Sequence, residues 1–361
     1  MQLYGNLLKF SVLLILLLIL SSCDFLKPVE DPASEEEPPG SQSITAISAH
    51  SNYAIYLTSK GEVYCVYMSF TYGPALKKSK VRGLKDIVEI SAGPANIMPT
   101  VYDCIALDKE GRIFVWDFDI IAERADSAVA FPFSSAFGSA KITHVATGGV
   151  NFPFYAATDS NGGLWTWGYN PDYALGDSSI VASRAQPAKI AGFNQPVKQL
   201  VGGTTQMLAL TSSGHIYQWG TISAQDKEVY KKPSLLSAES GHSKIAAGGN
   251  CNLATRSDAT VFSWGHLTDG LVPGIITPRS MSAGAETYFA PIFVMADGSV
   301  LKTWFSNITG MPQQVQPLDE LAGYGCKLVA AANRAFFVTV DNRLVCLPSM
   351  QTNVLVLNDP F

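Results

Sequence analysis

The sequence predicts an all-β fold, a seven-bladed β-propeller of four-stranded antiparallel blades, and three observations support this prediction. A short pattern of glycine, apolar residues and tryptophan recurs along the chain at intervals of 39 to 52 residues. An apolar run and a tight turn precede the copies, which is typical of a β-hairpin. A third run, ending in small residues, lies upstream of the hairpins. Repeats of this period bury their faces by stacking on neighbours, as the blades of a propeller do.

The most complete copy of the pattern is Gly162–Gly168, which reads Gly-Gly-Leu-Trp-Thr-Trp-Gly. Five of the six tryptophans take the same place in the repeat, and we expect their indoles to pack between neighbouring blades. These tryptophans are Trp116, Trp167, Trp219, Trp264 and, one residue out of phase, Trp304. The seven copies begin at Gly61, Gly111, Gly162, Gly214, Ala259, Gly298 and Asn342.

The third unit continues its tryptophan pattern through Trp167–Asn170, Tyr173–Asp177 and Pro187–Phe193, and the first two units are joined by Val81–Gly93. In these segments the sequence resembles the regulator of chromosome condensation repeat family, whose members are seven-bladed propellers. The resemblance extends over roughly residues 44–357, where seven units fit a closed ring. The resemblance implies a scaffold that mostly binds proteins, since the family includes an exchange factor for a nuclear GTPase and a secreted inhibitor of β-lactamase.

The sequence departs from the family pattern at three places. The family usually carries a histidine a few residues after the small-residue turn, whereas no unit of this chain keeps it clearly and His50 is the nearest candidate. The first and seventh units have Val66-Tyr67 and Leu347-Pro348 in place of Trp-Gly. We expect Thr352–Leu357, with its apolar run Val354–Leu357, to form the closing or outermost strand of the ring.

The first 22 residues have the pattern of a lipoprotein signal peptide. Lys9 supplies a positive charge, and the apolar run Phe10–Leu20 is too short to span a bilayer comfortably. The run ends in Leu20-Ser21-Ser22-Cys23, which resembles the bacterial lipobox and predicts lipidation of Cys23. Two or more acyl chains would supply stable anchoring. An uncleaved anchor and a plain secretory signal are the alternatives.

Three parts of the chain follow from this pattern: a signal peptide over 1–22, the lipidated cysteine with a tether over 23–42, and the propeller over 43–361. The tether is acidic and rich in proline, which predicts an extended linker. We therefore expect a membrane-anchored lipoprotein of the bacterial cell envelope, in the outer membrane or at the cell surface rather than in the cytoplasm. The lipid would be its only contact with the membrane.

The charge of the predicted propeller is close to zero. Of 30 acidic and 25 basic residues, six acidic and two basic residues precede it. A near-neutral domain lacks the positive field that attracts nucleic acid or anionic lipid. We expect no nucleic-acid partner.

No pattern in the sequence indicates catalysis, a metal site or a cofactor. The five cysteines after Cys23 include no Cys-x-x-Cys pair, and the five histidines fall at different points of the repeat. Nucleophile-elbow, phosphate-loop and zinc-protease motifs are absent from the sequence. Aspartates that precede hairpin turns are expected to bond their own turn backbone. They are Asp108, Asp159, Asp258, Asp297 and Asp341.

Three links between the small-residue turn and the next apolar run are long and rich in aromatic residues and proline. They cover residues 94–102, 150–155 and 286–293. Equivalent loops of a propeller emerge on one face, so these links predict a partner-binding rim. The rim candidates are Met98, Tyr102, Phe152, Phe154, Tyr155, Tyr288 and Phe289. The alternative is that some of these side chains fold inward, to plug the channel or cover a blade edge. The insertion Phe131–Phe137 is a weaker candidate.

Together these patterns predict a membrane-anchored, exported propeller that acts as a non-catalytic protein-binding module. Its partner would be an unidentified envelope or extracellular protein, and the chain itself would be a monomer. A carbohydrate-binding or carbohydrate-cleaving envelope propeller is the alternative, with the rim aromatics stacking on sugar rings. A scaffolding subunit of an envelope complex is a third possibility.

Overall fold

The computed structural model describes most of the chain from Gln42 onward. The described ranges are 42–69, 75–94, 102–119, 124–125, 127–223, 228–249, 251–265, 270–284, 291–304, 314–348, 354–357 and 360–361. The chain divides into the units Met1–Ser41 and Gln42–Phe361, and all described residues belong to the second. Within these ranges, no helix has the length and apolar character needed to cross a membrane.

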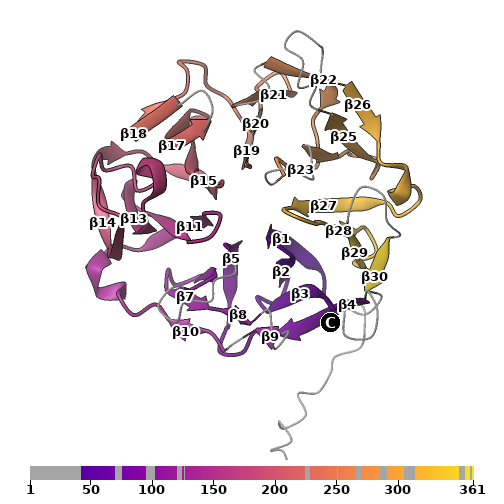
Figure 1. The fold of residues 1–361 in the computed structure, drawn as a ribbon, viewed down its shortest axis with the longest axis horizontal. Coiled ribbons are helices and arrows are strands. Elements are labelled where there is room, and N and C mark those ends of the chain that lie inside the picture. Colours follow the sequence, from indigo (N-terminus) through magenta and orange to yellow (C-terminus); the bar gives the residue numbers. More distant parts are fainter. Residues whose placement is uncertain are drawn as a thin grey trace, which may run out of the picture. The chain divides into compact units, whose positions relative to one another are not determined.

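Seven four-stranded antiparallel sheets surround a central axis in the described part of Gln42–Phe361 (Figure 1). In each sheet the first strand in the chain is innermost and the last is outermost. Each innermost strand contacts the innermost strand of the next blade, and β27 contacts β1, so the ring is closed. The predicted fold class is confirmed. The innermost strands are β1 (Ile44–His50), β5 (Ile87–Ala92), β11 (Ile142–Gly148), β15 (Val197–Gly202), β19 (Lys244–Ala247), β23 (Ser280–Ser282) and β27 (Cys326–Ala331).

The other strands complete the blades, which are numbered one to seven in chain order. The second strands are β2 (Tyr53–Thr58), β6 (Cys104–Asp108), β12 (Phe154–Asp159), β16 (Gln206–Thr211), β20 (Asn252–Thr255), β24 (Ile292–Val294) and β28 (Ala335–Thr339). The third strands are β3 (Val63–Ser69), β7 (Ile113–Trp116), β13 (Gly163–Tyr169), β17 (Ile216–Ser223), β21 (Thr260–Trp264), β25 (Val300–Trp304) and β29 (Leu344–Leu347). The outermost strands are β4 (Ala75–Lys80), β10 (Val129–Ala130), β14 (Ser183–Asn194), β18 (Glu228–Leu235), β22 (Gly270–Ile276), β26 (Gln314–Pro317) and β30 (Leu355–Leu357).

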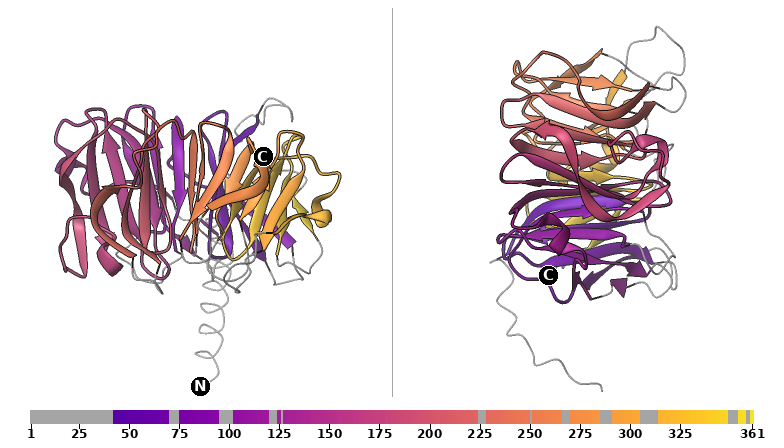
Figure 2. Two further views of the ribbon diagram at one scale, coloured as in Figure 1. Left: turned by 90° about the horizontal axis from the view of Figure 1, so that it is seen from above. Right: turned by 90° about the vertical axis from the view of Figure 1, so that its left-hand side faces the viewer.

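A few short elements lie outside the seven sheets. Strands β8 (Phe118–Asp119) and β9 (Arg124–Ala125) pair with each other beside blade two. Among the described residues, three 3-10 helices, η2 (Ser134–Phe137), η3 (Pro171–Tyr173) and η4 (Asp319–Leu321), lie in connections between strands. Figure 2 shows the ring from the side, with the strands running between its two faces. We name the faces by their connections: the B–C face has the turns from second to third strands, and the A–B face has the links from first to second strands.

The turns on the B–C face form as the sequence predicts. Asp108 Oδ1 accepts hydrogen bonds from the backbone N–H groups of Glu110 (3.0 Å) and Arg112 (2.8 Å). In blades one, four and seven a threonine hydroxyl takes the place of this aspartate, as when Thr211 Oγ1 accepts from His215 N (3.0 Å). The aspartates are therefore turn residues rather than a cluster for catalysis.

The repeated tryptophans pack between neighbouring blades, as expected. Trp116, Trp167, Trp219 and Trp264 are buried, whereas the side chain of Trp304 lies outside the described residues. The indole N–H of Trp219, in blade four, donates to the carbonyl of Ala174 in blade three (3.0 Å). Burying an aromatic ring of this size contributes about 3–5 kcal/mol when truncation to alanine is the measure. Each of the four described indoles thus packs its blade against the preceding one.

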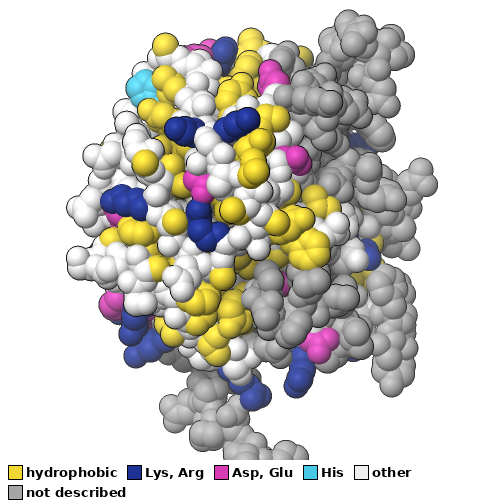
Figure 3. Space-filling model, turned by 60° about the vertical axis from the view of Figure 1, so that its left-hand side comes forward, with side chains coloured by type: hydrophobic (Ala, Val, Ile, Leu, Met, Phe, Trp, Pro, Cys, Tyr) yellow, Lys and Arg dark blue, Asp and Glu magenta, His cyan; other side chains and the backbone are white. Residues whose placement is uncertain are grey.

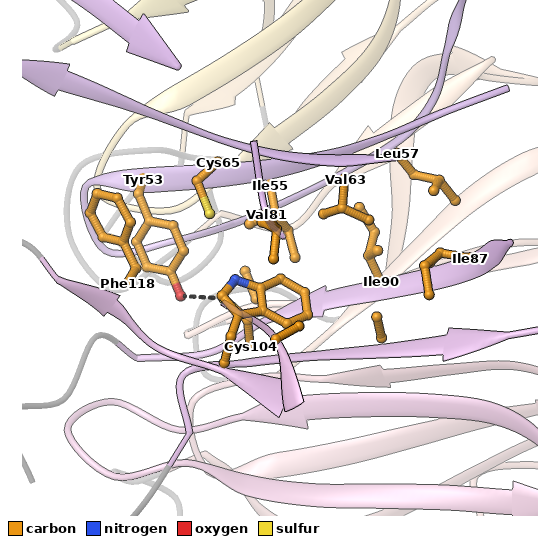
Figure 4. Packing of buried hydrophobic residues seen from close by; sticks show 14 of the residues in the cluster. Tyr53, Ile55, Leu57, Val63, Cys65, Val81, Ile87, Ile90, Cys104 and Phe118 are labelled. Carbon is orange, nitrogen blue, oxygen red and sulfur yellow. Dashed lines mark hydrogen bonds between the residues drawn. The ribbon is translucent and has the colours of Figure 1, made fainter. Parts of the chain in front are cut away.

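Blades one and two enclose a large apolar cluster (Figure 4). Tyr53 of β2 stacks on Phe118 with ring centroids 4.8 Å apart, and its hydroxyl lies 3.3 Å from Cys104 Sγ. Cys65 completes this end of the cluster. All five described cysteines are free and buried, so the thiols fill space in the core.

The central channel forms a cavity of about 370 Å³ that the innermost strands line. Its serine side chains turn sideways into the next blade. Ser48 Oγ accepts from Ala92 N, Ser91 Oγ accepts from Thr147 N, and Ser282 Oγ accepts from Ala331 N, each at 3.0 Å. These hydroxyls hold the channel wall together.

Candidate functional site

Phe154 and Tyr155 belong to the core, and the expectation that they lie on an exposed rim is wrong. Phe154 is the first residue of β12 and is fully buried in a cluster with Leu175 and Trp219. The Tyr155 ring stacks on Trp167, with centroids 5.3 Å apart and an angle of 14° between the rings. Strand β12 begins at Phe154, so Phe154 faces blade four and Tyr155 faces blade two, and the exposed link is shorter than residues 150–155.

Tyr102 and the Phe131–Phe137 insertion also serve the junction between blades two and three. Tyr102 packs half-buried against the cluster around Trp167, and its carbonyl accepts a hydrogen bond from the Tyr155 hydroxyl. Phe131 and Phe137 are buried against Trp167, at ring distances of 5.2 and 5.8 Å. These aromatic residues thus contribute to packing between blades. The candidates Met98, Tyr288 and Phe289, and the lipidation candidate Cys23, lie outside the described residues.

Phe152 remains at the surface and is part of an apolar patch on the A–B face of blade three. Its half-buried ring lies 5.0 Å from the ring of Tyr169, at an angle of 50°. The exposed fractions on the A–B connections of this blade are 89% for Ile180, 47% for Val181, 38% for Tyr169 and 37% for Val150. The blade-three patch consists of Val150, Phe152, Tyr169, Ile180 and Val181.

Ile180 and Val181 come from the connection between β13 and β14, which sequence reasoning did not select. The available signal was an adjacent pair of aliphatic residues inside a polar, turn-rich segment, Asp177-Ser178-Ser179-Ile180-Val181. Figure 3 shows the side of the ring that carries β14 and β18, where hydrophobic side chains lie among lysines and arginines. Large exposed aliphatic groups of this kind often mark interaction sites.

Hydrogen bonds fix the connection that carries Ile180. Asn170 Oδ1 accepts from Leu175 N (3.0 Å), and Asn170 Nδ2 donates to the carbonyl of Val181 (3.0 Å). Ser178 N donates to the carbonyl of Lys231 on β18 (2.9 Å), which ties the connection to blade four. The result is a rigid loop that presents an aliphatic tip.

Backbone strain and an ion pair accompany this loop. Asp172, Tyr173 and Ser178 have φ values of 50°, 65° and 64°, which side-chain-bearing residues rarely adopt and which cluster at functional sites. The Arg184 guanidinium pairs with Asp177. Burial opposes the charge of Asp177, but hydrogen bonds from Ser179 and the nearby Arg184 outweigh it and lower the pKa of the carboxyl. The Asp177 carboxylate is therefore charged at neutral pH and keeps its ion pair with Arg184.

His50 lies at the A–B end of the channel. Its Nε2 is 2.8 Å from the carbonyl oxygen of Gly149, and its Nδ1 is 3.0 Å from Ser51 Oγ. Burial lowers the pKa of His50 to about 4, and the Gly149 hydrogen bond opposes this only in part. The imidazole is therefore neutral at pH 7.

The other described residues contain neither a reactive thiol nor a cluster of metal-binding side chains. Burial raises the pKa of the Cys65, Cys251 and Cys346 thiols to about 12, which removes the thiolate needed for nucleophilic work. Within the described ranges, no three histidine, cysteine or acidic side chains come together as a metal site would require.

The sequence of this chain is similar to a known repeat family and to several known proteins. Residues 161–210 match the family model of the Regulator of chromosome condensation (RCC1) repeat. The E3 ubiquitin-protein ligase HERC2 of Homo sapiens is 24% identical over 232 residues, which cover 58% of this chain and 5% of that protein. Protein pim1 of Schizosaccharomyces pombe is 25% identical over 243 residues, covering 58% of this chain and 42% of that protein. The matches thus span less than half the length of these relatives.

Solved structures extend the likeness to the whole ring. Prp20p from Saccharomyces cerevisiae, whose structure was determined with its binding properties to Gsp1p and histones, superposes with a TM-score of 0.59 at 16% identity, covering 80% of each chain. Human WBSCR16 gives a TM-score of 0.50 at 14% identity, covering 81% of this chain and 70% of that chain. The chain therefore resembles the RCC1 proteins in one repeat by sequence and in its seven-bladed ring by fold.

Proposed function

We propose that this chain is an exported, lipid-anchored propeller that binds another protein through the blade-three patch and performs no catalysis. The observation that carries the proposal is Ile180, a residue that is 89% exposed in a hydrogen-bonded loop. An exposed aliphatic side chain on a preorganised loop loses little entropy on binding, which favours affinity. The partner is an envelope or extracellular protein that offers apolar side chains to the patch.

Protein binding is supported over carbohydrate binding by the shape and composition of the patch. Sugar rings stack on flat aromatic faces, whereas Phe152 and Tyr169 are tilted by 50° to each other and are flanked by aliphatic groups. Aromatic and aliphatic anchors surrounded by polar residues are typical of the centre of a protein interface. The binding of Gsp1p and histones by Prp20p is a precedent on the same fold.

The binding proposal is tested with Ile180→Asp. A photo-crosslinking residue at position 180 first captures the partner, which is then purified so that its Kd can be measured. A charge at the centre of an apolar contact should weaken binding by about tenfold or more. Ile276→Asp is the matched control, because Ile276 is 60% exposed on β22 of blade five. Equal affinities for wild type and Ile180→Asp would refute the proposal, and a fixed stoichiometry in co-purification would favour a scaffolding role.

Anchoring is tested separately with Cys23→Ala. The proposal predicts that the wild-type protein carries acyl groups on Cys23 and sediments with membranes, since two acyl chains give stable attachment. The variant should lose the acyl mass in mass spectrometry and remain in the soluble fraction. A wild-type chain that retains residues 1–22, or that begins elsewhere without lipid, would contradict this part of the proposal.

A further inference from the structure

We propose that His50 is a positioning residue for the blade-three patch: its imidazole reaches from blade one to blade three and holds the link that carries Val150 and Phe152. The inference rests on the proposed function of the patch. His50 is the last residue of β1, and Gly149 directly follows β11. The hydrogen bond between them therefore joins two blades that are not neighbours in the ring.

The chemistry of the two atoms fixes the protonation state of His50. A carbonyl oxygen only accepts hydrogen bonds, so Nε2 must carry the proton that is shared with Gly149 over 2.8 Å. Nδ1 is then the acceptor, and it receives the hydroxyl proton of Ser51 at 3.0 Å. The low pKa of His50 agrees with this neutral tautomer.

Both ends of this contact are themselves fixed by other blades. The carbonyl of Ser51 accepts from Asn333 N of blade seven (3.1 Å), and Gly149 N donates to the carbonyl of Gly203 in blade four (3.0 Å). His50 thus lies in a chain of hydrogen bonds that connects blades seven, one, three and four at the A–B end of the channel. Such a chain can hold one loop in one conformation.

The Gly149 end of the chain is coupled tightly to the patch. Gly149 has a φ of 130°, and a Cβ at this position would collide with the carbonyl of Phe152, so the link folds back on itself there. Val150 follows directly, and the Phe152 ring rests on Tyr169. Tyr169 N in turn donates to the carbonyl of Pro153 (3.0 Å). A rotation of the Gly149 carbonyl would therefore move both Val150 and Phe152.

The variants His50→Gln and His50→Asn form a matched pair for the test. Both carry an amide, but the longer glutamine side chain places its NH₂ group near the position of Nε2, whereas asparagine reaches only the position of Nδ1. The first readout is hydrogen–deuterium exchange of the full chain without partner. In His50→Asn, the segment 149–155 should exchange about tenfold faster or more, because opening of the link becomes easier. His50→Gln should stay close to wild type, and β16 (Gln206–Thr211) should be unchanged in both.

The second readout is the affinity for the protein captured at Ile180. Asn at position 50 should weaken binding severalfold, and Gln should restore it, which a general loss of stability would not do. Equal exchange in the two variants would overturn the positioning role, whatever the affinities. Faster exchange with unchanged affinity in His50→Asn would also overturn it, because the link would then not matter to binding. Failure of Ile180→Asp to reduce binding would instead refute the proposed function of the patch.

Discussion

At the scale of single residues, the repeated tryptophans combine packing, which the sequence predicts, with hydrogen bonding, which it does not predict. Trp219 fills the space between blades three and four, and its indole N–H also pairs with the carbonyl of Ala174. The packing could be predicted from the phase of the tryptophans, since a repeated large apolar residue needs a repeated interface. The hydrogen bond could not be predicted, because Ala174 lies in a connection without a repeat.

His50 gives the stability of the protein a specific pH dependence. Its pKa is about 4 in the folded protein and 6.5 ordinarily, so the unfolded chain binds more protons between these values. The contribution of His50 is therefore fully present above about pH 6.5 and is lost as pH falls towards 4. Between pH 7 and 5, the free energy of unfolding should fall by about 1–2 kcal/mol more in wild type than in His50→Gln. Denaturant titrations at the two pH values would measure this, and parallel losses in both proteins would contradict it.

At the scale of elements, the limits of sequence reasoning show at the start of β12. Phe152 to Ala157 reads as one apolar stretch interrupted only by Pro153, so the boundary between link and strand is hidden. In the structure Pro153 marks that boundary, because a residue without a backbone N–H suits the position before a strand. Blade type and turn chemistry follow from periodic residues, and most of the blade-three patch does not, because Ile180 and Val181 lie where no periodicity exists.

The division between core and surface predicts losses of stability of different size for Phe152 and Phe154. Phe154→Ala removes a fully buried ring and should lower the free energy of unfolding by about 3–5 kcal/mol. Phe152→Ala removes a half-buried ring in contact with Tyr169 and should cost about 0.5–1.5 kcal/mol. Urea unfolding followed by tryptophan fluorescence would compare the two. A larger loss for Phe152→Ala would reverse the assignment of core and surface.

At the scale of the whole ring, the last residues of the chain fasten blade seven to blade one. The Tyr56 hydroxyl donates to the carbonyl of Pro360, Lys78 Nζ donates to the carbonyl of Phe361, and the Phe361 ring packs on the cluster between these blades. Strands β30 and β4, the outermost of their blades, contact each other beside this point. Within the described part of the predicted segment Thr352–Leu357, Leu355–Leu357 is thus confirmed as the outermost strand of blade seven.

Removing Pro360 and Phe361 should weaken this junction. The loss of one buried acceptor and of the Phe361 packing should lower the free energy of unfolding by about 1–3 kcal/mol. Tyr56→Phe in the full chain should reproduce part of this loss and add little to it in the shortened chain, because both changes remove the same hydrogen bond. Full additivity of the two changes in denaturant titrations would show that the contact is not shared.

Each sheet of the ring is built from one uninterrupted stretch of chain, and no strand is traded between the two ends of the described sequence. The sheets follow one another around the axis in chain order, but the sheet with which synthesis starts is not dictated by the ring. A rearranged gene that began with β5 and joined the present ends by a short linker would encode the same closed circle without dividing any sheet.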